Sequence, residues 1–76
     1  MISVEYMKAL GKSIRQVRKE RKLTVSDLHY EVRMCRQAIM KIERGDVVPR
    51  LDSILSICQA LSVKPGALFE MVDNKL

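Results

Sequence analysis

The chain has 76 residues, 47% of them hydrophobic, and carries 14 Lys and Arg against nine Asp and Glu, a net charge of +5. A chain of this length forms one domain and buries only about 60% of the surface of its unfolded form, which leaves little room for a deep catalytic cleft. The basic excess lies in residues 1–50, with 12 basic and six acidic side chains. This distribution indicates an anionic partner, nucleic acid first, or else a solvated surface.

The two cysteines, Cys35 and Cys58, fit no metal-binding spacing and are expected to be reduced thiols. No apolar run has the length of a signal peptide, or of the roughly 20 residues that span a membrane. With one His, no paired carboxylates at a helical spacing and no Gly-rich phosphate loop, the sequence predicts no enzyme active site, metal or cofactor. We therefore expect a soluble cytoplasmic protein with no membrane partner.

The first predicted helix spans residues 4–21, where apolar side chains recur at steps of three and four. Its other side is basic, which also suits an anionic membrane surface, but the apolar face lacks Trp and Phe. Thr24 and Asp27 resemble a capping box and predict a short second helix over residues 25–32.

A third helix is predicted over residues 36–44, with Ile39 and Ile42 facing inward and Gly45 in a left-handed conformation just past its end. A fourth helix over residues 51–61 is predicted to bury its apolar side chains, and Pro65 suits the start of a fifth. The predicted inward residues of these two helices are Leu51, Ile54, Leu55, Cys58 and Leu61, followed by Leu68, Phe69 and Val72. No strand pattern appears, so the fold class is compact and all-α.

Residues 24–44 therefore form two short helices joined by a tight turn, which is a helix-turn-helix. If Ile39 and Ile42 face inward, the side chains of Arg36, Gln37 and Lys41 project outward. Arg and Lys pair with guanine and Gln pairs with adenine, so this face has the chemistry to read base edges in DNA. A polar, solvent-exposed face has the same composition, and spacing alone does not separate the two interpretations.

Several short motifs in a fixed order carry a family resemblance from about Leu10 to Phe69. These motifs are Ile14-Arg15 with Arg18, Leu23-Thr24, Leu28, Ile39, Ile42-Glu43-Arg44-Gly45, Pro49, and Ala60-Leu61-Ser62-Val63 with Leu68-Phe69. Together they resemble the Cro and phage-repressor family of helix-turn-helix DNA-binding domains, the XRE family. The resemblance implies a compact five-helix, repressor-like domain over residues 1–76.

The resemblance also implies roles for individual residues. The base contacts would come from the third helix, and the phosphate contacts from the start of the second helix and the loop after the third. An ion pair would join the first helix to the third. The residues concerned are Arg36, Gln37 and Lys41 for bases, Thr24, Arg44 and Arg50 for phosphates or the minor groove, and Arg18 with Glu43 for the ion pair.

Four residues depart from the family pattern inside the proposed DNA-binding unit. Val25 stands where the family has a Gln that touches a phosphate, and His29 stands where it has a small Ala. Arg33 occupies a turn position that is usually Gly, and Cys35 is a weaker helix cap than the usual Ser or Thr. His29 suggests a pH sensor and Cys35 a redox sensor, against packing or capping roles as the simpler interpretation.

The function implied is that of a small transcriptional regulator, a repressor, which binds specific double-stranded DNA as a homodimer on paired half-sites. The dimer surface would involve the C-terminal helix, through Phe69, Met71, Val72 and Leu76, or the loop before the fourth helix. The alternative for these four residues is ordinary core or a frayed tail. The alternative is a protein-interaction module on the same fold, such as an antitoxin, with weak or non-specific DNA binding. A regulatory protein partner is compatible with both.

Overall fold

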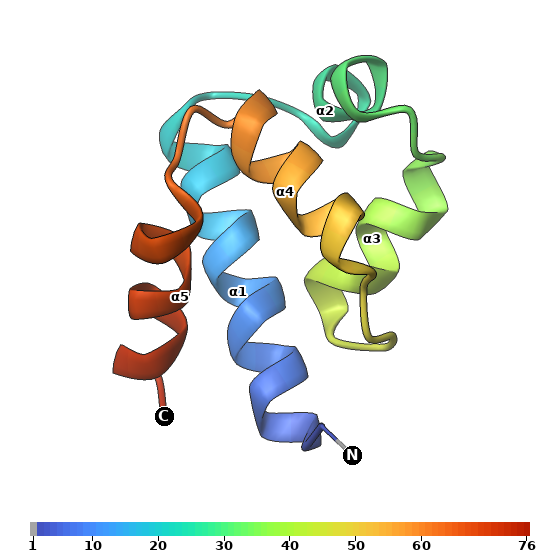
Figure 1. Ribbon diagram of the computed structural model, residues 1–76. Coiled ribbons are helices and arrows are strands. Elements are labelled where there is room, and N and C mark those ends of the chain that lie inside the picture. Colours follow the sequence, from blue (N-terminus) through green and yellow to red (C-terminus); the bar gives the residue numbers. More distant parts are fainter. Residues whose placement is uncertain (1) are drawn as a thin grey trace.

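The computed structural model describes residues 2–76, which form five helices and no strand (Figure 1). The helices are α1 (Val4–Glu20), α2 (Val25–Val32), α3 (Arg36–Arg44), α4 (Leu51–Ala60) and α5 (Pro65–Asn74). This arrangement confirms the expected all-α, five-helix class, and the expected ends of α1 and α4 are each one residue too long. None of these helices is both long enough and apolar enough to cross a membrane.

The helix starts follow from local chemistry. Ser3 caps α1, because its Oγ accepts a hydrogen bond from the backbone N–H of Tyr6. At α2 the capping box is complete: Thr24 Oγ1 accepts from the Asp27 N–H at 3.0 Å, and the Asp27 carboxylate accepts from the Thr24 N–H at 2.8 Å. Hydrogen bonding from Thr24, above all from its backbone N–H, holds the pKa of the Asp27 carboxylate below its ordinary value of 3.8. Pro65 occupies the first turn of α5.

The core receives at least one fully buried side chain from each of the five helices. These side chains are Ile14, Leu28, Ile39, Ile57 and Leu68, and each is 0% exposed. Helix α1 runs between α3 and α5, while α2 packs on α3 and α4 (Figure 1). The packing therefore presents the outer side of α3 at one edge of the domain.

Three residues expected to face the core are exposed instead. Leu51 and Leu55 of α4 are 65% and 44% exposed, and Phe69 of α5 is 41% exposed, whereas Ile57 is fully buried. The apolar residues of α4 permit two overlapping stripes, and the stripe that meets the other helices is Ile54, Ile57, Cys58 and Leu61. Tertiary packing selects between such stripes.

Of the two places expected for Val72, the core and a dimer surface, the structure shows the core. It is 4% exposed, so it offers little surface to a second copy of the chain. Leu76 and Phe69 remain exposed, and Met71 is half-buried against the core. Only the exposed part of the expected surface can therefore take part in association.

The turn between α2 and α3 contains a left-handed residue other than Gly. Arg33 has φ 52° and ψ 35°, a conformation that costs an L-residue with a Cβ about 1–2 kcal/mol. We expect Arg33→Gly to raise the free energy of unfolding by about 1 kcal/mol, because the greater freedom of Gly in the unfolded chain offsets part of the relief. Urea unfolding measures this difference.

Arg33→Ala is the matched control for this prediction. Alanine removes the same charged side chain but keeps the Cβ atom that opposes the left-handed conformation. We expect no gain in stability from this variant. Equal stabilities of the Gly and Ala variants would contradict backbone strain at Arg33.

Candidate nucleic-acid interface

The outer face of α3 brings together the three residues expected to contact bases. Arg36, Gln37 and Lys41 are all exposed, and they flank the exposed Met40. On the opposite face of the helix, Ile39 and Ile42 are buried as expected. Gly45 ends the helix with φ 77°, also as expected. The structure therefore places a polar and basic stripe along the whole length of α3.

Arg36 is held toward α2 by Ser26, a residue that the sequence analysis did not single out. Its Nε donates a hydrogen bond to Oγ of Ser26 at 2.9 Å. This bond uses Nε only, so the two terminal nitrogens of the guanidinium remain free to donate as a fork. Ser26 lies ten residues before Arg36, and the contact depends on the geometry of the turn, which local sequence patterns do not specify.

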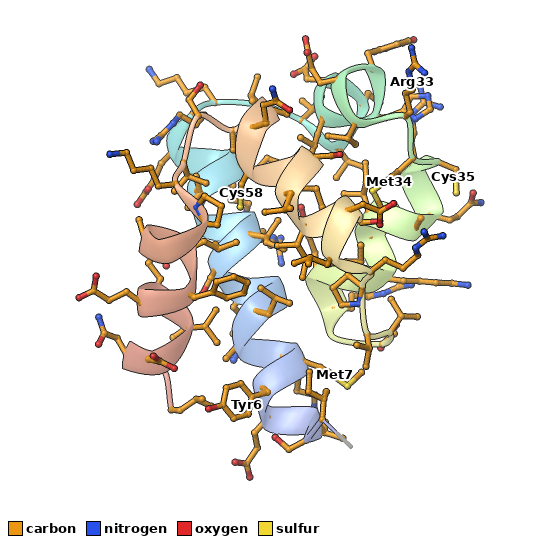
Figure 2. The ribbon with its side chains drawn as sticks, in the orientation of Figure 1. Tyr6, Met7, Arg33, Met34, Cys35 and Cys58 are labelled. Carbon is orange, nitrogen blue, oxygen red and sulfur yellow. The ribbon has the colours of Figure 1, made fainter. Side chains whose placement is uncertain are left out.

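His29 of α2 is hydrogen-bonded to the turn that leads into α3. Its ring Nδ1 is hydrogen-bonded to the carbonyl oxygen of Met34, and the half-buried ring lies 5.2 Å from the ring of Tyr30. Figure 2 shows Arg33, Met34 and Cys35 following one another along this turn. The half-buried imidazole therefore links α2 to the turn that leads into α3.

The two cysteines lie in different surroundings. Cys35 is exposed at the N-cap position of α3 and makes no side-chain capping bond, as expected for a weak capping residue. Cys58 is buried, and burial raises the pKa of its thiol (Figure 2). Cys58 is thus a core residue, which agrees with the sequence prediction.

The expected phosphate-binding residues are exposed, but each has a partner within the chain. The Thr24 hydroxyl accepts the capping bond and keeps its own hydrogen free to donate. Arg44 pairs with Asp46, with Nε and Oδ2 3.1 Å apart, and Arg50 pairs with Asp52 at 3.3 Å. Such exposed pairs contribute only about 0–1 kcal/mol, so a phosphate can replace either carboxylate.

Arg18 and Glu43 form the ion pair that the resemblance implies. Arg18 Nε and Nη2 donate to the two carboxylate oxygens of Glu43 at 2.7 and 2.9 Å, and Nη1 donates to the Leu23 carbonyl at 2.8 Å. The two side chains are only 10% and 7% exposed. The bonds to Glu43 raise the pKa of Arg18 despite its burial. The pair fixes α3 and the turn after α1 against α1.

A hollow of about 240 Å³ lies where α1, α2 and α3 meet, and we call it the basic hollow. The Arg18–Glu43 pair contributes to its lining, together with Arg15, Val25, Met40 and Arg44. Arg15 was not among the expected site residues. It precedes Arg18 by three residues, which places both on one side of α1, but this spacing does not distinguish Arg15 from the other basic residues of the helix.

Comparison with known proteins agrees with this geometry. A model of the Cro/C1-type helix-turn-helix DNA-binding domain matches residues 13–74. Comparison with curated protein sequences gives no significant match.

Solved structures of gene regulators are similar along nearly the whole chain. The clp gene regulator ClgR from Corynebacterium glutamicum is 20% identical with a TM-score of 0.88, over 100% of this chain and 96% of that chain. The wild-type restriction-modification controller protein C.Esp1396I is 27% identical with a TM-score of 0.84, over 92% and 91% of the two chains. The tetramer of that controller, in complex with its natural 35 base-pair operator, is 27% identical with a TM-score of 0.83, over 92% of each chain.

Proposed function

Because this chain belongs to the Cro/C1-type helix-turn-helix DNA-binding family, we propose that it recognises a specific double-stranded DNA sequence and acts as a small transcriptional repressor. The observation that carries this proposal is the exposed stripe on α3, where Arg36, Gln37 and Lys41 lie on the side opposite the buried isoleucines. A helix with such a face enters the major groove of B-DNA.

In this proposal, one set of residues contacts the DNA bases and another contacts the phosphates. Arg36 donates its free terminal nitrogens to a guanine while Ser26 holds Nε, Gln37 pairs with an adenine, and Lys41 reaches a second guanine. Thr24, Arg44 and Arg50 bind phosphates and set the register of α3 in the groove. The protein acts in the cytoplasm on DNA and performs no chemical reaction on it.

We also propose that the active form is a homodimer. An apolar groove of about 310 Å³ lies between the first turns of α1, the loop before α4, and α5. Exposed apolar side chains from all three segments line it, among them Tyr6, Val48 and Phe69. A two-fold interface uses the same patch on both copies, and the tetrameric state of the operator-bound controller protein supports self-association.

Arg36→Ala tests base reading directly. Loss of the fork to guanine is expected to weaken binding to the preferred duplex by about 1–3 kcal/mol and to relax specificity at one base pair. Arg36→Lys is the matched variant, because it keeps the charge but loses the planar fork. The measurement is a fluorescence-anisotropy titration of the preferred duplex and of its single-base variants.

The control for this test is Lys64→Ala, which removes an exposed positive charge beside α5. It is expected to leave base preference unchanged. Unchanged affinity of Arg36→Ala at every salt concentration would contradict the DNA-reading role. That result would favour a protein-interaction module on the same fold.

A further inference from the structure

We propose that the basic hollow binds the sugar-phosphate backbone of DNA and that Arg15 is its phosphate-binding residue. This inference rests on the proposed function and assigns a role to α1, from which the DNA-binding family resemblance drew no contact. Three features of the hollow carry it: its position, its unpaired charge and its apolar lining.

The hollow lies beside the exposed stripe of α3. Met40 and Arg44 line it from α3, and they belong to the same exposed stripe as Arg36, Gln37 and Lys41. Val25, the first residue of α2, lines it from the other helix of the helix-turn-helix. A DNA strand at the edge of the major groove that holds α3 therefore passes over this hollow.

The three arginines that line the hollow differ in whether a carboxylate already pairs with them. Arg18 is committed to Glu43 in the buried pair, and Arg44 pairs with Asp46. Arg15 is exposed, and within residues 2–76 no carboxylate lies within ion-pair distance of its guanidinium. Arg15 thus offers a full positive charge to an incoming phosphate, with no internal partner to displace.

The apolar residues of the hollow suit the deoxyribose that adjoins each phosphate of a DNA strand. Val25 and Met40 present methyl, methylene and thioether groups, against which the carbon atoms of a deoxyribose can pack. The side chain of Val25 has no donor for a phosphate. Arg15 supplies one from α1, so the hollow combines a charged donor with an apolar wall.

The test is the salt dependence of binding for Arg15→Ala, measured with the duplex that the wild-type protein prefers. Each phosphate neutralised by a side chain adds about 0.9 to the slope of log affinity against log salt concentration. We expect Arg15→Ala to reduce this slope by about 1 and to lower affinity about tenfold at low salt, with base preferences unchanged. Arg15→Lys is expected to restore most of the slope.

Lys12→Ala is the matched control, because Lys12 is exposed one turn earlier on α1 and faces Lys75 and Leu76 at the end of the chain. It removes the same charge and is expected to leave the slope unchanged. An unchanged slope and affinity for Arg15→Ala, while Arg36→Ala still weakens binding, would overturn this inference and leave the proposed function standing. Altered base preference in Arg15→Ala would also overturn it, since phosphate contacts carry no sequence information. Failure of the wild-type protein to bind any duplex would overturn both.

Discussion

Glu43→Ala is expected to lower the free energy of unfolding by about 3–5 kcal/mol, because it leaves the Arg18 guanidinium buried without a counter-charge. The Arg18 guanidinium gives two of its three hydrogen bonds to Glu43, and both side chains are largely shielded from water. For a domain of this size the loss is a large part of the total stability. Urea unfolding followed by circular dichroism at 222 nm would measure it.

The nearby exposed pair provides the control for this expectation. Asp46→Ala removes the partner of Arg44, and those two side chains are 55% and 59% exposed, so the change is expected to stay within about 1 kcal/mol. The double variant Arg18→Met with Glu43→Leu is expected to recover much of the loss, since it removes both charges at once. Equal effects of Glu43→Ala and Asp46→Ala would contradict a structural role for the buried pair.

Gly11→Ala is expected to destabilise the domain by about 2–3 kcal/mol, in the upper part of the usual range of about 1–3 kcal/mol for overpacking. A Cβ atom at Gly11 would lie 2.4 Å from the carbonyl oxygens of both Ile42 and Glu43, so α1 and α3 would have to move apart. The better helix propensity of Ala, worth about 1 kcal/mol, opposes this effect without cancelling it. A thermal melt would show a fall of about 4–8 °C for each kcal/mol lost.

Gly66→Ala is the control, because it changes helix propensity without introducing a steric clash. A Cβ atom at Gly66 meets nothing within 4 Å, so this variant gains propensity alone and is expected to be more stable than the wild type. If Gly11→Ala were also more stable, the close approach of α1 and α3 would be disproved. Because α3 carries the residues proposed to contact bases, Gly11→Ala is expected to weaken DNA binding as well.

Local features of the sequence were sufficient to predict the helices. The Thr24–Asp27 capping box, the left-handed Gly45 and the position of Pro65 depend on neighbouring residues, and all three occur as expected. The buried face of α4 was predicted less well, because Leu51 and Leu55 satisfy the same helical spacing as the residues that are buried. Only packing against the other helices chooses between the two stripes.

The remaining features of the site depend on contacts between helices that are distant in sequence. Nothing near Gly11 indicates that the α3 carbonyls pass within contact distance of it. The bond from Arg36 to Ser26 requires the particular turn that Arg33 and His29 create. Arg15 resembles the other basic residues of α1 until the structure places it in a hollow with Val25 and Met40.

Selection of binding sites from a pool of random duplex DNA at physiological salt tests the central claim most directly. A dimer that reads bases through α3 predicts an enriched inverted repeat, with half-site centres about one helical turn, or 10–10.5 base pairs, apart. Guanine and adenine are expected at the positions that face Arg36 and Gln37. A bound pool without enrichment, retained only by salt-sensitive attraction, would contradict sequence reading by α3 and direct the search to protein partners.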